Sequence, residues 1–196
     1  LTINGSIVTN VGTTGLRVAL VSATAGVVTF ANSVVITNGG KLFTAGNSFI
    51  GLGHTLRENG YRTAFFHGAQ NGSMGLDTAA KMVGFQEYFG KDEFLSWPGA
   101  RVEDYDGDWG IFDEPFLGFV ADRLDGFREP FAAAILTLTT HQPYAIPKKY
   151  EGEFPPTHDP MARCVRYLDR SLSGFFESAR KKPWFRNTLF VITGDH

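Results

Sequence analysis

The stretch "PFAAAILTLTTH" (residues 130–141) decides the fold class. Residues 131–138 are apolar except for one threonine, and a histidine closes the stretch. A nearly unbroken apolar run of this length is typical of a strand that is covered on both faces, as strands of parallel sheets are. The stretch therefore predicts a buried strand with a polar side chain, His141, just past its C-terminal end.

Helix and strand patterns alternate on both sides of this strand. Runs of strand formers mark the strands, and apolar residues at steps of three and four mark the helices. Asp113 is the expected N-cap of one helix, and Asp159 with Pro160 opens another. The predicted strands are residues 61–66, 130–140 and 188–193, and the predicted helices are residues 47–59, 76–83, 113–124 and 159–179. This alternation predicts an α/β fold, with helices on both sides of a mostly parallel sheet.

Polar side chains follow three of the predicted strands. They are His67, the pair Thr140-His141, and the pair Asp195-His196. Loops beyond the carboxyl ends of parallel strands form the ligand crevice of such sheets, so we expect these side chains at a common edge. A carboxylate oxygen and an imidazole nitrogen suit Mn, Zn or another divalent ion better than Ca alone. For each residue alone, a helix cap or a hydrogen-bonded surface histidine remains the alternative.

The composition excludes several classes of function. The net charge is −2 and the basic residues are scattered, so no nucleic-acid groove is indicated. Cys164 is the only cysteine, which rules out an internal disulfide, and its place on an apolar helix predicts a small core residue. The glycine-rich "GAQNGSMG" (68–75) lacks the lysine of a P-loop, and "DYDGDWG" (104–110) lacks the glutamate of a calcium loop and is expected to be a solvated turn.

Residues 1–46 differ from the rest of the chain. All 20 acidic residues lie from Glu58 onward, and the first segment is rich in Val, Ile, Thr, Asn and Gly. We expect a β-rich segment of uncertain origin at 1–46 and a separate α/β domain at 47–196. The uncharged stretch 18–40 is broken by polar residues and is not expected to span a membrane. Leu1 and His196 are both expected to be internal cuts of a longer protein.

Six blocks carry a resemblance to a known family. They are "GYRTAFFHGAQNGSMG", "GFQEYFGKDEF", "DGDWGIFDEPF", "LTLTTHQPY", "RYLDRSLSGFFE" and "KKPWFRNTLFVITGDH". Together they resemble the sulfatase-like branch of the alkaline phosphatase superfamily, in particular lipoteichoic acid synthases and phosphoglycerol transferases. The resemblance covers about residues 45–196. It implies an alkaline phosphatase-like α/β sandwich on the extracytoplasmic (periplasmic) side of the cell membrane, tethered by membrane segments that this chain lacks.

The resemblance also implies the chemistry. Such enzymes transfer phosphoglycerol or phosphoethanolamine, or cleave related esters, through a threonine or serine whose oxygen is bound by a divalent ion. By this resemblance Asp195 and His196 bind the metal, Mn first, with Zn, Mg or Ca as alternatives, while His67 and His141 contact a phospholipid or glycan headgroup. The metal would lower the pKa of the nucleophilic hydroxyl.

Some positions depart from the family pattern. Met74 and Leu76 stand where lipoteichoic acid synthases carry Trp and Arg, which puts the same glycerol phosphate substrate in doubt. The nucleophile is expected after a basic residue near the N-terminus, but Val18 follows Arg17 there. Thr13 and Thr14 are the nearest hydroxyl-bearing candidates, so the nucleophile stays unassigned. The acidic metal ligand expected near the start is also missing.

Three hypotheses about function follow. The first is a fragment of a metal-dependent transferase or ester hydrolase, inactive by itself. The second is a β-rich surface or binding protein that carries a degenerate catalytic relic. Separately, the first 45 residues could be a mistranslated or misassembled join. The third, a sulfuric ester hydrolase, is disfavoured because Cys164 does not lie in the C-x-P-x-R pattern that a formylglycine sulfatase needs.

Overall fold

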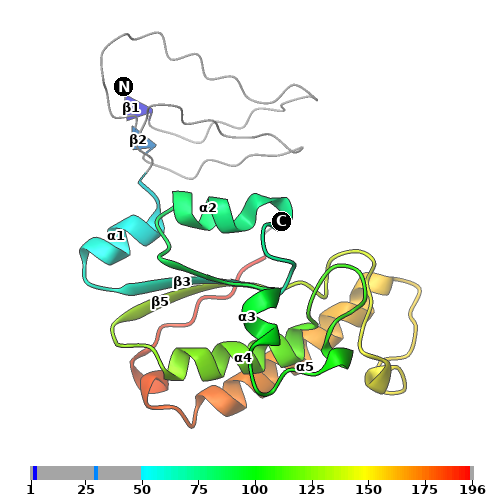
Figure 1. Ribbon diagram of the computed structural model, residues 1–196. Helices are drawn as coiled ribbons and strands as arrows, with labels where there is room; N and C mark the ends of the chain where they lie inside the picture. Colours follow the sequence, from blue (N-terminus) through cyan, green and yellow to red (C-terminus); the bar gives the residue numbers. More distant parts are fainter. Residues whose placement is uncertain (1, 4–28, 31–49, 195–196) are drawn as a thin grey trace. The chain divides into compact units, whose positions relative to one another are not determined.

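The computed structural model describes residues 2–3, 29–30 and 50–194 (Figure 1). The chain divides into two compact units, Leu1–Leu52 and Gly53–His196. In the first unit, β1 (Thr2–Ile3) pairs in parallel with β2 (Thr29–Phe30). The rest of the predicted β-rich segment lies outside the described residues, so the boundary between 46 and 47 stays a prediction.

The sheet of the second unit has three parallel strands. β3 (Arg62–His67) lies in the middle, between β4 (Glu87–Phe89) and β5 (Phe131–Leu136). The register of β3 and β5 runs from Arg62 opposite Phe131 to His67 opposite Leu136. The prediction of an α/β fold with a parallel sheet is therefore confirmed, and the C-terminal ends of β3 and β5 meet at one edge.

Helices cover both faces of this sheet, with α2 on one side and α4 and α5 on the other (Figure 1). The α-helices are α1 (Leu52–Glu58), α2 (Leu76–Met82), α3 (Lys91–Leu95), α4 (Asp113–Asp125) and α5 (Pro160–Ala179). Short 3-10 helices lie at η1 (Ser73–Gly75), η2 (Val102–Asp104), η3 (Lys148–Tyr150) and η4 (Pro183–Asn187). As predicted, the side chain of Asp159 caps α5 by accepting from the Met161 N–H.

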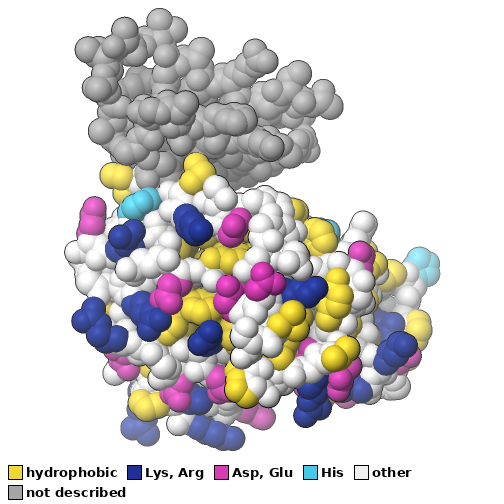
Figure 2. Space-filling view, viewed as in Figure 1, with side chains coloured by type: hydrophobic (Ala, Val, Ile, Leu, Met, Phe, Trp, Pro, Cys, Tyr) yellow, Lys and Arg dark blue, Asp and Glu magenta, His cyan; other side chains and the backbone are white. Residues whose placement is uncertain are grey.

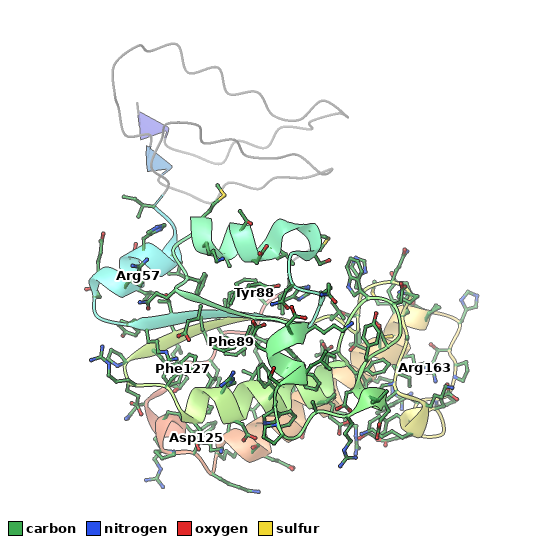
Figure 3. All side chains as sticks on the ribbon, in the orientation of Figure 1. Arg57, Tyr88, Phe89, Asp125, Phe127 and Arg163 are labelled. Carbon is green, nitrogen blue, oxygen red and sulfur yellow. The ribbon has the colours of Figure 1, made fainter. Side chains whose placement is uncertain are left out.

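The main core lies between the sheet and α4 and is largely aromatic. The rings of Phe66 and Phe89 stack with their centroids 4.7 Å apart, and Phe119 of α4 meets both edge-on. Phe127 extends this cluster, and Figure 3 shows Phe89 and Phe127 between the strands and α4. Offset and edge-to-face pairs of this kind contribute about 0.5–1.5 kcal/mol each beyond the area they bury.

A second cluster lies under the irregular segment between β5 and α5. Tyr167 is its centre and contacts Phe112, Tyr150 and Phe154. Cys164 is buried in the same cluster, and burial raises the pKa of its thiol. The prediction that Cys164 is a core residue is confirmed.

Three local predictions are wrong. β5 is not the predicted buried strand: it lies at the edge of the described sheet, none of its residues is fully buried, and Ile135 is 36% exposed. Asp113 is not the N-cap of α4: Phe112 takes that position, and Asp113 is the first helical residue, because its carboxylate is used by another segment. Residues 188–194 do not form the predicted strand, since they make no ladder with any described strand. Phe190 anchors this segment against Phe176 and Phe185 instead.

Charged side chains of both signs are interspersed over the face of the second unit that Figure 2 shows. Several pair with one another, such as Arg62 with Glu87 at 2.6 Å and Arg170 with Glu153 at 2.9 Å. The C-terminal segment is less polar, because Leu189 is 87% exposed and Val191 and Ile192 are also exposed.

Removing one aromatic ring tests the core. Phe66→Ala should lower the free energy of unfolding by about 3–5 kcal/mol, because the fully buried ring leaves a cavity between β3, β4 and α4. Urea unfolding followed by circular dichroism measures the change. Val102→Ala, at a side chain that is 92% exposed, is the control and should stay within about 0.5 kcal/mol. Equal effects of the two substitutions would contradict this account of the core.

Candidate functional site

His67 ends the central strand and is only 2% exposed. Its Nδ1 lies 3.0 Å from the carbonyl oxygen of Leu136 on β5. Because a carbonyl can only accept, Nδ1 carries the proton and donates, which leaves a lone pair on Nε2 of the neutral ring. Nε2 is buried and has no hydrogen-bond partner among the described residues. The ring is therefore held in one orientation with an unused acceptor.

Burial lowers the pKa of His67 below its ordinary value. Desolvation is the main cause, the hydrogen bond to Leu136 opposes it, and the nearby His141 lowers it further. The imidazole is consequently neutral at pH 7, which suits it to accept a hydrogen bond or to bind a metal ion.

His141 follows β5 by a short turn and is exposed. Its backbone N–H donates to the Leu138 carbonyl at 2.9 Å, and its Nδ1 lies 2.9 Å from the Gln142 carbonyl. The imidazole stacks on the indole of Trp109, with ring centroids 4.8 Å apart and planes inclined by 12°. The ring therefore has a defined position although it lies at the surface.

The turn between β5 and His141 is held by Asp113. This carboxylate is 1% exposed and accepts from the backbone N–H of Leu138 at 2.7 Å and of Thr139 at 3.1 Å. The Asp113 N–H in turn donates to the Thr139 hydroxyl at 3.1 Å. Burial raises the pKa of Asp113, and the hydrogen bonds from Leu138 and Thr139 oppose that rise. The start of α4 thus fixes the exit of β5.

Trp109 lies in a tight turn that Asp106 organises. One carboxylate oxygen of Asp106 accepts from the backbone N–H of Asp108, Trp109 and Gly110, at 2.8, 2.8 and 3.0 Å. The turn rests on the residues that follow His67, since Gly110 pairs with Ala69. A Cβ at Gly110 would lie 2.6 Å from the Gly68 carbonyl oxygen, so only glycine fits this contact. The predicted solvated turn is confirmed for residues 107–109, whereas Asp104 ends η2 and Tyr105 and Gly110 form bridges.

The glycine-rich loop after His67 leads into α2. Asn71 anchors it, because its amide donates to Glu93 at 2.9 Å and accepts from the Asp92 N–H at 3.2 Å. Met74 has a positive φ of 51° and is exposed between two glycines, Gly72 and Gly75, that also have positive φ. An apolar, exposed side chain therefore stands at one of the two positions that depart from the family pattern.

The structure brings two of the six predicted site residues together. His67 and His141 leave adjacent strands at the same sheet edge, as the sequence predicted, and they are close enough to affect each other electrostatically. Asp195, His196, Thr13 and Thr14 lie outside the described residues. Within residues 2–3, 29–30 and 50–194 no three His, Cys, Asp or Glu side chains cluster around a possible metal position.

Sequence reasoning missed Trp109 and the role of Asp113. Both residues belong to one segment, "DWGIFD" (108–113), which contains the tryptophan that stacks on His141 and ends at the start of α4. A buried aspartate at a helix start resembles an ordinary N-cap in sequence. A tryptophan in a turn carries no local signal for the residue on which it stacks.

Comparisons with known proteins give a consistent answer. The sequence model of the Sulfatase family matches residues 19–196. The chain is 28% identical over 173 residues to the lipoteichoic acid synthase-like protein YvgJ of Bacillus subtilis (strain 168), covering 85% of this chain and 27% of that protein. It is 29% identical over 154 residues to phosphoglycerol transferase I of Escherichia coli (strain SMS-3-5), covering 74% of this chain and 20% of that protein. The chain thus spans about a quarter of these relatives or less.

Two solved structures share the fold. A protein of the alkaline phosphatase superfamily from Vibrio parahaemolyticus superposes with a TM-score of 0.59 at 25% identity, over 74% of this chain and 35% of that one. The lipoteichoic acid synthase LtaP from Listeria monocytogenes superposes with a TM-score of 0.55 at 19% identity, over 68% of this chain and 33% of that one. The prediction of an alkaline phosphatase-like fold is confirmed.

Removing the Asp113 carboxylate should loosen the exit of β5. Asp113→Ala leaves the N–H groups of Leu138 and Thr139 buried without acceptors, and we expect a loss of about 3 kcal/mol in the free energy of unfolding at pH 7. Asp113→Asn keeps one acceptor oxygen, so its free energy of unfolding should fall by less than that of Asp113→Ala. Chemical denaturation measures both. The control is Asp169→Ala, at an exposed acid on α5; if it cost as much as Asp113→Ala, the anchoring role would be wrong.

His67 should make the stability depend on pH in one direction. Its pKa is lowered in the folded state, so below the unfolded pKa of about 6.5 the unfolded chain binds more protons, and stability falls as the pH falls. The slope is at most about 1.4 kcal/mol per pH unit for one proton. Urea unfolding between pH 5 and 8 measures it. His67→Gln should reduce the slope of stability against pH. The control His158→Gln, at an exposed histidine, should give the same slope as the unmodified protein. An unchanged slope in His67→Gln would refute the assignment.

Proposed function

Because this chain belongs to the sulfatase family, we propose that it is part of a divalent-metal-dependent transferase or ester hydrolase of the phosphoglycerol or phosphoethanolamine type. The substrates would be the headgroups of envelope lipids or glycans. One observation carries the proposal. His67 and His141 lie at the C-terminal edge of the parallel sheet, at the ends of the adjacent strands β3 and β5, in a chain whose relatives are named lipoteichoic acid synthase-like and phosphoglycerol transferase.

The two histidines suit different parts of a headgroup. Nε2 of His67 offers a lone pair, so it would accept a hydrogen bond from a substrate hydroxyl once a movement of the surrounding residues makes this buried nitrogen accessible. His141 is exposed at the rim. Its Nδ1 donates to the Gln142 carbonyl, so in the doubly protonated ring Nε2–H would donate to a phosphate oxygen. Both rings are held before any ligand binds, His67 by the Leu136 carbonyl and His141 by Trp109. Preorganised contacts of this kind reduce the ordering cost of binding.

We propose that Asp195 and His196 hold the metal ion, as members of this superfamily generally use divalent metals. Mn is the first choice, with Zn, Mg or Ca as alternatives. An Asp oxygen and a His nitrogen fit such an ion. The described residues do not form a cluster of three ligands by themselves, so further ligands would have to come from elsewhere in the protein. When bound, the ion would supply Lewis-acid stabilisation of the ester oxygen.

The headgroup should differ from that of the lipoteichoic acid synthases. Met74 is exposed in the loop that follows His67, and Leu76 begins α2. They stand where the family pattern has Trp and Arg, and neither side chain can donate a hydrogen bond or carry a positive charge. The site therefore lacks, at these two positions, the polar contacts that the family pattern would supply. We propose a headgroup with a less polar or smaller part on this side of the site.

We also propose that the enzyme works on the extracytoplasmic side of the membrane, because its substrates would lie there. Among the described residues, no helix is both long and apolar enough to cross a bilayer. We propose that the chain alone is inactive, because it matches only 27% and 20% of the length of its relatives. Thr13 and Thr14 stay the nearest candidates for the nucleophile. The site residues and the 1–46 and 47–196 division are part of this proposal.

Turnover by the full-length parent protein tests the proposal. With Mn²⁺ it should hydrolyse a chromogenic phosphodiester, and the 196-residue chain alone should not. Asp195→Ala in the parent should weaken Mn²⁺ binding at least about tenfold, measured by titration calorimetry, because one of the charged ligands is lost. Asp169→Ala is the matched control and should bind Mn²⁺ like the unmodified protein. Unchanged Mn²⁺ affinity in Asp195→Ala would contradict the assignment of Asp195 as a metal ligand.

A further inference from the structure

The imidazole of His141 lies flat on the indole of Trp109. The ring centroids are 4.8 Å apart and the planes differ by 12°, which is a face-to-face contact. An exposed histidine usually rotates about its side-chain bonds, and fixing it costs conformational entropy. Here the indole provides a flat platform, and the Gln142 carbonyl near Nδ1 sets the rotation of the ring in its plane.

The platform itself is rigid. Asp106 accepts hydrogen bonds from three backbone N–H groups around Trp109, and the next residue, Gly110, pairs with Ala69, two residues after His67. The Ile111 N–H also donates to the Gly68 carbonyl at 3.0 Å. Trp109 is therefore fixed to the same part of the fold that carries His67, so the stack sets the position of one histidine relative to the other.

The indole is not an optimal choice for stability alone. Its Nε1 is buried and has no hydrogen-bond partner among the described residues. A buried donor without a partner costs about 1–3 kcal/mol, a cost that a phenylalanine would not carry. The broad, electron-rich indole face has another use, because it attracts an imidazole in its neutral form and more strongly in its protonated form. The stack can therefore hold His141 in both states.

From these contacts we propose that Trp109 is a positioning residue: it holds the His141 ring in place for the phosphate of the headgroup. The inference rests on the proposed function, because it takes His141 to be a headgroup contact. Trp109 acts through His141 and needs no contact of its own with the reacting atoms. Loss of the platform should weaken ground-state and transition-state binding alike, which raises KM and leaves kcat nearly unchanged.

The experiment uses two variants of the full-length parent protein. Trp109→Leu removes the aromatic face, and Trp109→Phe keeps a smaller one. We expect Trp109→Leu to raise KM for a chromogenic phosphodiester about tenfold with less than a twofold change in kcat. The KM of Trp109→Phe should stay within about threefold of that of the unmodified protein. Trp97→Leu is the matched control; its ring packs on the core residues Phe94 and Phe119, and its loss should leave KM unchanged.

Two further measurements separate positioning from a purely structural role. In NMR spectra, the His141 ring protons should be shifted upfield by the indole in the unmodified protein, partly in Trp109→Phe, and not in Trp109→Leu. NMR titration with glycerol phosphate, used as a probe of the phosphate contact alone, gives the binding affinity independently of turnover, and Trp109→Leu should bind it about tenfold more weakly. If the parent protein does not turn over any phosphodiester, the proposed function fails while this titration still decides the role of Trp109.

Three results would overturn the inference. The first is an unchanged His141 ring shift in Trp109→Leu, which would mean that the stack does not exist in solution. The second is unchanged glycerol phosphate binding in a Trp109→Leu protein that has lost the ring shift. The third is a Trp109→Phe variant as impaired as Trp109→Leu, because the indole N–H rather than the ring face would then be the important group.

Discussion

The buried carboxylate of Asp113 is the contact on which the arrangement of this edge depends. It stands at the first position of α4 and binds two backbone N–H groups just after β5, so it joins the helix layer to the sheet at one point. An acid buried to this degree is costly unless its oxygens are hydrogen-bonded, and here they are. A carboxylate in the first turn of a helix is also favoured by the helix dipole.

One short segment serves both histidines. Residues 106–113 begin with the turn that carries Trp109, continue along the backbone that follows His67, and end at Asp113. Trp109 supports the His141 ring, and Asp113 holds the backbone from which His141 extends. The two ends of the segment therefore act on the same residue in different ways. This explains how an exposed imidazole can keep a defined place beside a buried one.

Much of the fold could be predicted because its elements are strongly patterned. The periodic helix ending at Ala179 was recognisable because burial of one helix face requires such a pattern. The apolar run at 131–138 predicted a strand correctly, although β5 is half-buried at the edge of the described sheet. Other features depend on partners far along the chain. The strand Glu87–Phe89 is too short to show a pattern, and 188–193 has strand-forming residues but no ladder partner. The shared edge of His67 and His141 followed from topology, whereas Trp109 depends on a contact across 32 positions of sequence (141 − 109).

The segment after η4 has a consequence for handling the isolated polypeptide. Leu189, Val191 and Ile192 are exposed, and residues 188–194 carry no charge, include β-branched residues and belong to no sheet of the described part of the chain. Such a stretch is a template on which a second molecule can add its own extended chain. At high concentration, self-association should therefore start here, and a lysine in place of Val191 would act as a gatekeeper against aggregation.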